Sequence, residues 1–403
     1  MRRISIKDVI TDKISGEWGD EALDTRGVVV IRAANFLNSG KINFSNLIRR
    51  EIDQKKIEKK KLISGDIIIE KSGGSPTQPV GRVVIFQNPD DDTYLCNNFT
   101  SILRPNRSQI HPEFLFYLLS DNHKKGKTLG YQNKTTGIIN LKLDSYLDSE
   151  ILVPSLDDQI RIAHLLGKVE GLIAQRKQHV QQLDDLLKSV FLEMFGDPIL
   201  NPHGFPVGKL SEFYVNPKEG TKCGPFGSAL KKEELVDAGV PVWNMDNIAS
   251  GGRMALPFRM WITAGKYDEL AAYSVKDGDI IVSRAGTVGK MCVARMNEQP
   301  AIISTNLIRV RLGDRLRPLH FVSLMLYCKG RVGRLKTGAD GAFTHMNTGV
   351  LDSLEFPYPS IELQDQFAAV VEKVEAVKSR YQQSLTDLEA LYGALSQQAF
   401  KGE

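Results

Sequence analysis

Two long stretches of the chain carry hydrophobic side chains at alternating steps of three and four residues. One follows Ser155 and the other follows Ser360. This spacing places the side chains on one stripe of an α-helix, and its persistence is typical of a coiled coil. We predict two long helices, with Arg176 and Ser384 as the polar positions in their stripes. The hydrophobic positions are Ile162, Leu166, Val169, Ile173, Val180, Leu183, Leu187 and Val190 in the first, and Phe367, Val370, Val374, Val377, Tyr381, Leu388, Leu391 and Leu395 in the second.

The ends of the first predicted helix carry recognisable signals. Ser155 is a favourable N-cap residue, and Asp158 at the third helical position completes a capping-box pattern. A Gly-Asp-Pro sequence at 196–198 ends the pattern. At 1.5 Å per residue such a helix is about 60 Å long.

A helix with one hydrophobic stripe needs a partner that covers it. Each helix packs either on its own neighbouring domain or on the other helix. We favour the second arrangement, an antiparallel coiled coil, because the chain repeats itself and two repeats related by a pseudo-twofold axis bring equivalent helices together in opposite directions.

The segments before the two helices repeat one another. The sequence GDII occurs at Gly65 and again at Gly278, 213 residues later. Further pairs follow in the same order: Asn35 with Asn247, Asn98 with Asn306, and the Pro-Ser pairs before the helices, with the offset falling to 205. Four matches in order indicate a duplication with small loop deletions.

Each repeat begins with short strand-like runs, Gly/Pro turns and brief helical patterns. We therefore predict an α+β fold with two tandem mixed α/β domains, at residues 1–153 and 198–358. A helical segment follows each domain, at residues 154–197 and 359–403.

Composition narrows the class of protein. The 403 residues are 42% hydrophobic and 25% charged, and suit two or more domains of a soluble protein. No stretch has the roughly 20 apolar residues that span a membrane, and the N-terminus lacks a signal-peptide core, so we expect a cytoplasmic protein without a membrane partner. The four cysteines have no paired spacing, which disfavours a zinc site.

Motifs for catalysis are incomplete. The stretch RAGTVGKM has Arg284 where a nucleotide-binding P-loop has its first glycine, and Met291 where it has its hydroxyl residue. An Asn-Pro-Pro-aromatic methyltransferase motif is absent, and nuclease-like carboxylate patterns are incomplete. We predict a non-catalytic chain with no catalytic residue and no metal or cofactor of its own.

Basic and polar loops remain as candidate binding residues. Lysine and arginine neutralise phosphates, and Arg, Asn and Gln contact base edges. Net charge is only +4, so a nucleic-acid surface would be local. The candidates are Lys71, Ser72, Gly74, Gln78, Arg82, Tyr131, Asn133, Lys134 and Thr135 in the first half, and Lys222, Phe226, Ser228, Ser283, Arg284, Thr287, Lys290, Lys336, Phe343 and His345 in the second.

The ordered repeat resembles the DNA specificity subunit of type I restriction–modification enzymes over nearly the whole chain. The resemblance rests on the stretch at 224–248, on both GDII stretches with their glycine loops, on the Asn-containing strands at Asn98 and Asn306, and on the Pro-Ser openings with Gln159 and Gln364. One departure is Leu363, which stands before Gln364 where the family usually has an acidic residue.

The resemblance implies that each mixed domain is a target recognition domain that reads one half of a split, asymmetric sequence in double-stranded DNA. The helices would set the spacing and dock two modification (methyltransferase) subunits. S-adenosylmethionine, ATP and magnesium would bind to those partners or to a restriction/motor subunit. Two alternatives remain open: a fused nuclease or methyltransferase with degenerate motifs, and a coiled-coil scaffold without DNA recognition.

Overall fold

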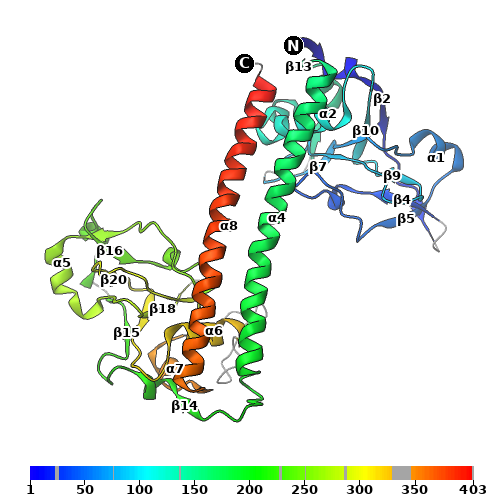
Figure 1. The fold of residues 1–403 in the computed structure, drawn as a ribbon. Coiled ribbons are helices and arrows are strands. Elements are labelled where there is room, and N and C mark those ends of the chain that lie inside the picture. Colours follow the sequence, from blue (N-terminus) through cyan, green and yellow to red (C-terminus); the bar gives the residue numbers. More distant parts are fainter. Residues whose placement is uncertain are drawn as a thin grey trace. The chain divides into compact units, whose positions relative to one another are not determined.

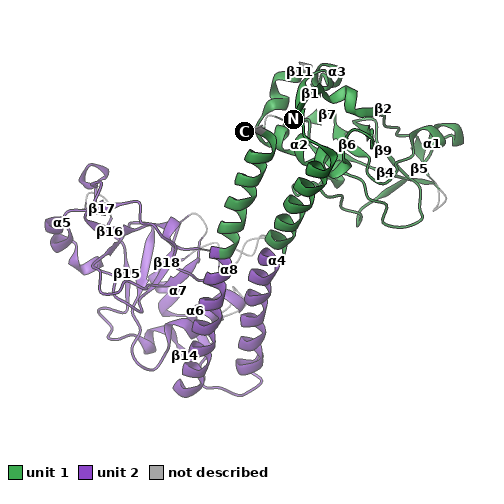
Figure 2. Ribbon diagram, turned by 45° about the horizontal axis from the view of Figure 1, so that its top comes forward, with its two compact units in different colours: residues 1–175, 384–403 green, residues 176–383 purple. Residues whose placement is uncertain are grey.

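The computed structural model describes residues 1–22, 27–75, 77–135, 138–226, 229–249, 251–285, 288–328 and 346–401. The chain divides into two compact units, which are described separately (Figure 2). Unit 1 comprises residues 1–175 and 384–403, and unit 2 comprises residues 176–383. The boundaries between the units fall within the long helices, because each mixed domain packs on parts of both helices. The predicted four-part division stays a prediction.

Unit 1 contains a four-stranded sheet of order β2-β10-β6-β8, and a second of order β3-β5-β4-β9 in which β4 and β9 are parallel. A three-stranded sheet, β11-β12-β7, and the pair β1-β13 complete it (Figure 1). Its strands are β1 Arg2–Ser5, β2 Ile10–Ser15, β3 Asp20–Glu21, β4 Val28–Ile31, β5 Ile48–Glu51, β6 Ile67–Glu70, β7 Ser72–Gly74, β8 Val83–Ile85, β9 Tyr94–Cys96, β10 Thr100–Pro105, β11 Gln132–Thr135, β12 Ile138–Leu141 and β13 Glu150–Val153. Its short helices are α1 Gln54–Lys60, α2 Pro112–Lys124 and α3 Leu143–Leu147.

Unit 2 repeats this plan with a sheet of order β15-β21-β18-β19, a sheet β17-β16-β20 with a parallel β16-β20 pair, and the pair β14-β22. Its strands are β14 Val207–Lys209, β15 Thr221–Cys223, β16 Val240–Trp243, β17 Trp261–Ile262, β18 Ile280–Ser283, β19 Met291–Val293, β20 Ile302–Ile303, β21 Leu307–Val310 and β22 Glu355–Pro357. Its short helices are α5 Ala264–Glu269, α6 Pro318–Cys328 and α7 Thr348–Asp352. The matching strand orders support the predicted duplication.

One predicted pairing within the repeat is wrong by one residue. Thr100 lies opposite Glu70 in unit 1, whereas Leu307 lies opposite Ser283 in unit 2. Because Glu70 and Ser283 end the two GDII strands, Asn306 corresponds to Phe99 and not to Asn98. Strand register, which side-chain identity alone does not reveal, decides this alignment.

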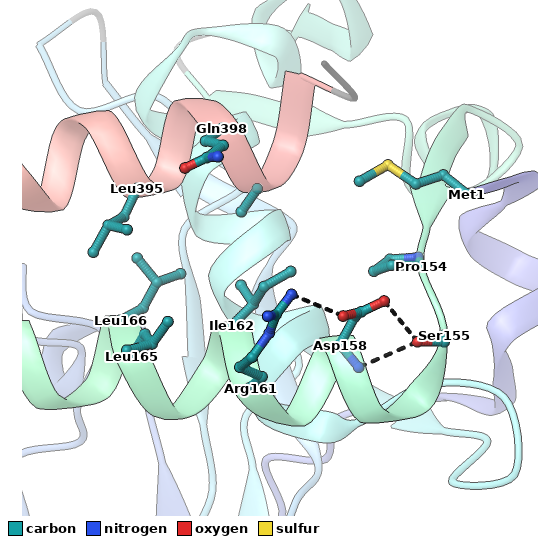
Figure 3. A pocket seen from close by; sticks show the side chains of 11 residues that line it. Met1, Pro154, Ser155, Asp158, Arg161, Ile162, Leu165, Leu166, Leu395 and Gln398 are labelled. Atoms are coloured by element: carbon teal, nitrogen blue, oxygen red, sulfur yellow. Dashed lines mark hydrogen bonds and ion pairs between the residues drawn. The ribbon is translucent and has the colours of Figure 1, made fainter.

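The two predicted long helices are present as α4, Leu156–Phe195, and α8, Ile361–Lys401. The Ser155 hydroxyl accepts a bond from the Asp158 amide (3.3 Å), which confirms Ser155 as the N-cap (Figure 3). The Asp158 carboxylate accepts from the Ser155 hydroxyl (2.7 Å), whereas in a capping box it accepts from the backbone amide of the N-cap residue. The Leu363 amide donates to the Ser360 hydroxyl at 3.4 Å, so the second helix begins at the equivalent position.

A buried glutamine ties the first turn of each long helix to its domain. The Gln159 side chain accepts from the His111 amide at 2.7 Å and donates to the Gln109 and Pro154 carbonyls. Gln364 accepts from the Arg317 amide at 2.8 Å and donates to the equivalent two carbonyls, those of Arg315 and Pro359. Both side chains are fully buried, so these glutamines join helix and domain.

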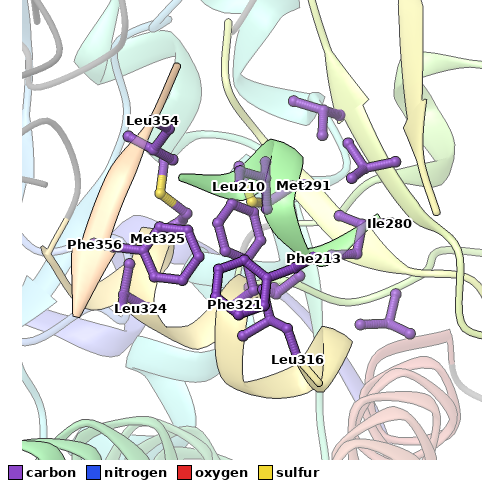
Figure 4. Close-up of a cluster of buried hydrophobic side chains, with 14 of the residues drawn as sticks. Leu210, Phe213, Ile280, Met291, Leu316, Phe321, Leu324, Met325, Leu354 and Phe356 are labelled. Carbon is purple, nitrogen blue, oxygen red and sulfur yellow. The ribbon is translucent and has the colours of Figure 1, made fainter. Parts of the chain in front are cut away.

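The helices pack both on each other and on the domains, so the two arrangements considered from sequence coexist. In unit 1, Ile162, Leu166 and Leu395 lie together (Figure 3) and join the core that contains Phe114. In unit 2 the helices contribute to a core in which Phe213 and Phe321 both pack against Phe356, with ring centroids 5.6 and 5.4 Å apart (Figure 4). In each unit the segments of α4 and α8 run in opposite directions (Figure 1).

The predicted stripe of the first helix is buried or half-buried throughout, but that of the second helix is partly wrong. Val377 and Leu391 are 39% and 46% exposed. The protected face instead includes Val371, Lys378 and Tyr392, one residue further along. The prediction placed the apolar Val377 in the stripe because lysine is usually exposed, whereas the structure buries the neighbouring Lys378.

Candidate nucleic-acid interface

In unit 1 two strands of the main sheet end at the same edge. Strands β2 and β6 both pair antiparallel with β10, so they run in the same direction. Lys71 directly follows β6, and its ammonium group donates to the hydroxyl of Ser15, the last residue of β2, at 2.5 Å. Lys13 and Lys142 line the same cleft, whose volume is about 500 Å³. Three lysines thus surround one polar opening, together with the Asp144 carboxylate, which pairs with Lys13.

Electrostatics distinguish Lys71 from an ordinary surface lysine. Partial burial lowers its pKa, and the positive charges of Lys60 and Lys13 lower it further. An anion in the cleft would relieve this repulsion, so the arrangement suits a phosphate group.

The small sheet β11-β12-β7 brings the two candidate stretches of the first half together. Strand β12 lies between them, with Asn140 opposite Asn133 on one side and Ser72 on the other. The Ser72 hydroxyl donates to the Asn140 side-chain oxygen at 2.5 Å, and Asn133 is exposed. Lys134 and Thr135 belong to β11, but their side chains lie outside the described residues.

Gln78 lies at an exposed turn next to this sheet. Its backbone exchanges hydrogen bonds with Ser75 at 2.9 and 3.1 Å, which leaves the amide side chain of Gln78 exposed. Asn133 and Gln78 are therefore the exposed side chains in this region that suit contact with base edges.

Three other candidates of the first half are engaged within the domain. The Arg82 guanidinium donates to both carboxylate oxygens of the buried Glu70, at 2.8 and 3.1 Å. Tyr131 packs on the ring of Tyr146, with centroids 5.5 Å apart. A Cβ on Gly74 would lie 2.8 Å from a methyl group of Val80, so a larger residue does not fit there. This geometry accounts for all three without a nucleic acid.

Unit 2 has the same sheet edge with different chemistry. Strands β15 and β18 both pair antiparallel with β21, and Arg284 follows β18 as Lys71 follows β6. The Arg284 guanidinium lies over the Phe226 ring, 4.8 Å from its centroid, and Phe226 is 56% exposed. Phe226 therefore presents a flat aromatic surface beside a positive charge, a combination that suits nucleotide bases.

The remaining candidates of the second half differ in accessibility. Lys222 lies over the Tyr273 ring at 5.2 Å, Lys290 is exposed, and Ser283 is buried. The other five predicted residues lie outside the described residues: Ser228, Thr287, Lys336, Phe343 and His345.

The aspartates of the two GDII stretches have a structural role that was not predicted from the sequence. Asp66 accepts two hydrogen bonds from the Arg104 guanidinium, each 2.9 Å long. Asp279 accepts two from Arg311, each 2.8 Å long. Each carboxylate also accepts from the amide three residues before it. An Arg at matching positions of both halves was the available signal.

Asn35 and Asn247, paired by the repeat, are also structural. Each is 2% exposed, accepts from the backbone amide three residues earlier and donates to backbone carbonyls of the following loop. The repeated buried residues thus shape the domains, while the sheet edge varies between them.

Two further observations concern the described residues as a whole. No group of three or more His, Cys, Asp or Glu side chains among them is arranged to hold a metal ion. Their helices also include none with the length and hydrophobicity needed to cross a bilayer.

Comparison with known families identifies the class of domain. Residues 4–183 match the family model described as "Type I restriction modification DNA specificity domain". The predicted resemblance to the DNA specificity subunits of type I restriction–modification enzymes is thereby confirmed.

One relative extends the match beyond that domain, and a second is similar over a shorter stretch. The putative type I restriction enzyme MjaX specificity subunit of Methanocaldococcus jannaschii is 23% identical over 389 residues, which cover 92% of this chain and 85% of the relative. The HindI specificity subunit of Haemophilus influenzae is 24% identical over 167 residues, 40% of this chain and 35% of that protein.

Solved structures share the fold. The S subunit of a type I restriction–modification system from M. genitalium superposes with a TM-score of 0.61 at 16% identity, covering 99% of this chain and 96% of that one. A chain from a structure of the type I R-M system, described for its complex assembly and conformational transition, gives a TM-score of 0.55 at 18% identity, covering 99% and 97%. These likenesses confirm the predicted fold class.

Proposed function

We propose that this chain is the DNA-reading specificity subunit of a type I restriction–modification complex. Each mixed domain reads one half of an asymmetric bipartite target in double-stranded DNA, and the paired helices set the distance between the halves. The observation that carries this proposal is the repeated sheet edge, which has a basic residue at one position in both units, Lys71 and Arg284, but different neighbours.

The different neighbours support an asymmetric target. Lys71 lies among lysines, serines and one aspartate in a cleft, whereas Arg284 lies against an exposed aromatic ring. Two edges with unlike chemistry select unlike base sequences.

Partner subunits would supply the chemistry. The incomplete catalytic motifs support a chain that recognises DNA while two modification subunits bind S-adenosylmethionine and transfer methyl groups. A motor subunit, where present, would use ATP and magnesium.

Duplex binding at increasing salt concentration tests this proposal with the chain and its modification subunits together. A specific complex that weakens steeply with salt is expected, because Lys and Arg contacts to phosphates release counterions. Negligible binding at every salt concentration would favour the scaffold alternative.

An activity assay tests the second alternative. The isolated chain, given duplex DNA, S-adenosylmethionine and magnesium, should neither methylate nor cut it. Turnover by the isolated chain would support a fused enzyme and contradict the proposal.

A further inference from the structure

One charged side chain lies inside the helix pair of unit 2. Lys378 occupies the protected face of α8 and is fully buried, including its ammonium group. That group makes an ion pair with the Asp184 carboxylate of α4, and a Glu375 carboxylate oxygen lies 3.8 Å away. Asp184 and Glu375 remain 40% and 30% exposed, so only the lysine is removed from water completely.

A buried ammonium group is strongly unfavourable without a partner, and its removal from a carboxylate costs far more than the loss of a surface ion pair. The position does not require a charge for helix pairing as such. At the repeat offset of 205 set by Gln159 and Gln364, the first half has Ile173 where the second has Lys378. The pair is thus an added feature of unit 2.

The pair discriminates between alignments of the two helices. Heptad patterns allow antiparallel helices to slip by seven residues while hydrophobic stripes still meet. Such a slip would move Lys378 from Asp184 to Phe191 in one direction and to Lys177 in the other. The first leaves a buried charge against an aromatic ring, and the second opposes two positive charges.

We propose that the Lys378–Asp184 pair fixes the axial register of α8 against α4, which makes Lys378 a positioning residue for the distance between the two DNA half-sites. The effect of the pair on the distance between half-sites rests on the proposed function, whereas its effect on the helix register does not. Polar residues at single core positions have this effect in several coiled coils, where they specify alignment at some cost in stability.

Pulsed electron spin resonance on the full chain measures the register directly. Spin labels at the exposed positions Gln178 of α4 and Lys373 of α8, both in unit 2, report the axial offset of the helices. Introduction through a non-natural amino acid leaves the native cysteines in place. A slip of one heptad displaces one label by about 10 Å relative to the other.

Lys378→Met keeps most of the length of the side chain but removes its charge. We expect a second distance population beside the native one, from helices slipped axially by about 10 Å; the distance between the labels changes by less than this, because it also contains the lateral separation of the helices. Lys378→Arg keeps the charge and should retain one distance. Asp184→Ala removes the partner carboxylate of Lys378 and should also give the second distance population. Asp185→Ala, which alters a neighbouring exposed carboxylate, is its matched control and should retain one distance.

A charge reversal keeps the test decisive if a single variant fails to fold. Lys378→Asp combined with Asp184→Lys should restore one native distance in a chain whose circular dichroism matches the wild type. A single unchanged distance in folded Lys378→Met, or a second population in the double variant, would overturn the proposal.

Methylation mapping with the same variants separates this inference from the proposed function. A displaced helix population together with altered half-site spacing supports both. If the spin labels show displacement while the spacing stays constant, the pair sets the register but the helices do not set the spacing.

Discussion

The two units share a set of buried polar residues but differ in the exposed ones. Both contain a buried glutamine at the start of a long helix. Both also contain a GDII aspartate that is hydrogen-bonded to an arginine, and a buried asparagine that donates to backbone carbonyls of the loop that follows it. At the sheet edge, Lys71 with Ser15 contrasts with Arg284 on Phe226. The duplicated interior keeps each domain in shape, so the edges are free to differ.

Two interior positions also differ between the units. Phe114 of α2 packs against Phe400, whereas the equivalent position of α6, aligned through the carbonyl partners of the glutamines, is His320. His320 is 1% exposed and stacks on Phe191, with centroids 5.7 Å apart. Unit 2 therefore contains buried ionisable groups, His320 and Lys378, at positions where unit 1 has apolar ones.

The largest expected effect comes from breaking the shared aspartate–arginine pair. Asp279→Ala leaves the Arg311 guanidinium, which is 11% exposed, without its buried partner. We expect a loss of about 3–5 kcal/mol in the free energy of unfolding. Urea unfolding followed by circular dichroism checks this, with Asp268→Ala on exposed α5 expected to stay within about 0.5 kcal/mol. Equal stability of both variants would refute a structural function for the pair.

The hydrogen bonds of the two buried glutamines should contribute equally to the free energy of unfolding in the two units. Gln159→Ala and Gln364→Ala each leave a partly buried backbone amide of the adjoining segment without its partner, at a cost of about 1–3 kcal/mol. Gln398→Ala, at an exposed position of α8, is the control. A clear loss in one variant and none in the other would show that the repeat is not energetically equivalent.

Low pH should destabilise unit 2 through protonation of His320 in the unfolded chain. Burial lowers the pKa of His320 to about 3 from its ordinary value of 6.5. The unfolded chain therefore binds a proton that the folded chain rejects, so stability falls as pH drops below 6.5. Between pH 7.5 and pH 5 this amounts to about 2 kcal/mol. His320→Phe, which introduces the residue of unit 1, should reduce this pH dependence in urea unfolding; an unchanged profile would contradict the account.

The smallest effects are expected at the sheet edges. Lys71→Ala and Arg284→Ala should change the free energy of unfolding by no more than about 0.5 kcal/mol, because neither side chain makes a buried ion pair among the described residues. Each should weaken specific DNA binding by about 1 kcal/mol, and the loss of a phosphate contact lowers the slope of log affinity against log salt concentration by about one.

Filter binding at several salt concentrations checks the two variants. Arg82→Ala is the contrasting variant, because it should destabilise unit 1 by removing the partner of Glu70.

Regular patterns in the sequence predicted the larger features. Three–four spacing gave both helices, and the Ser155 cap gave the start of the first. Ordered matches such as GDII predicted the duplication that the strand orders show. These signals succeed because they depend on local chemistry, repeated along the chain.

Long-range pairing was harder to predict. Arg82 looks like a DNA-binding residue in sequence, but its position on β8 beside β6 brings it to Glu70. Lys378 looks like a surface residue until Asp184 is placed against it. In both cases a charged side chain acquires its structural partner through tertiary contacts, which local sequence patterns do not encode.

Methylation mapping of host DNA with the wild-type chain and with Arg284→Ala tests the central claim most directly. The account predicts an asymmetric bipartite target for the wild type, and a variant in which one half-site becomes less specific while the other half-site and the spacing stay unchanged. Equal relaxation of both half-sites, or a continuous target, would contradict the assignment of one domain to each half.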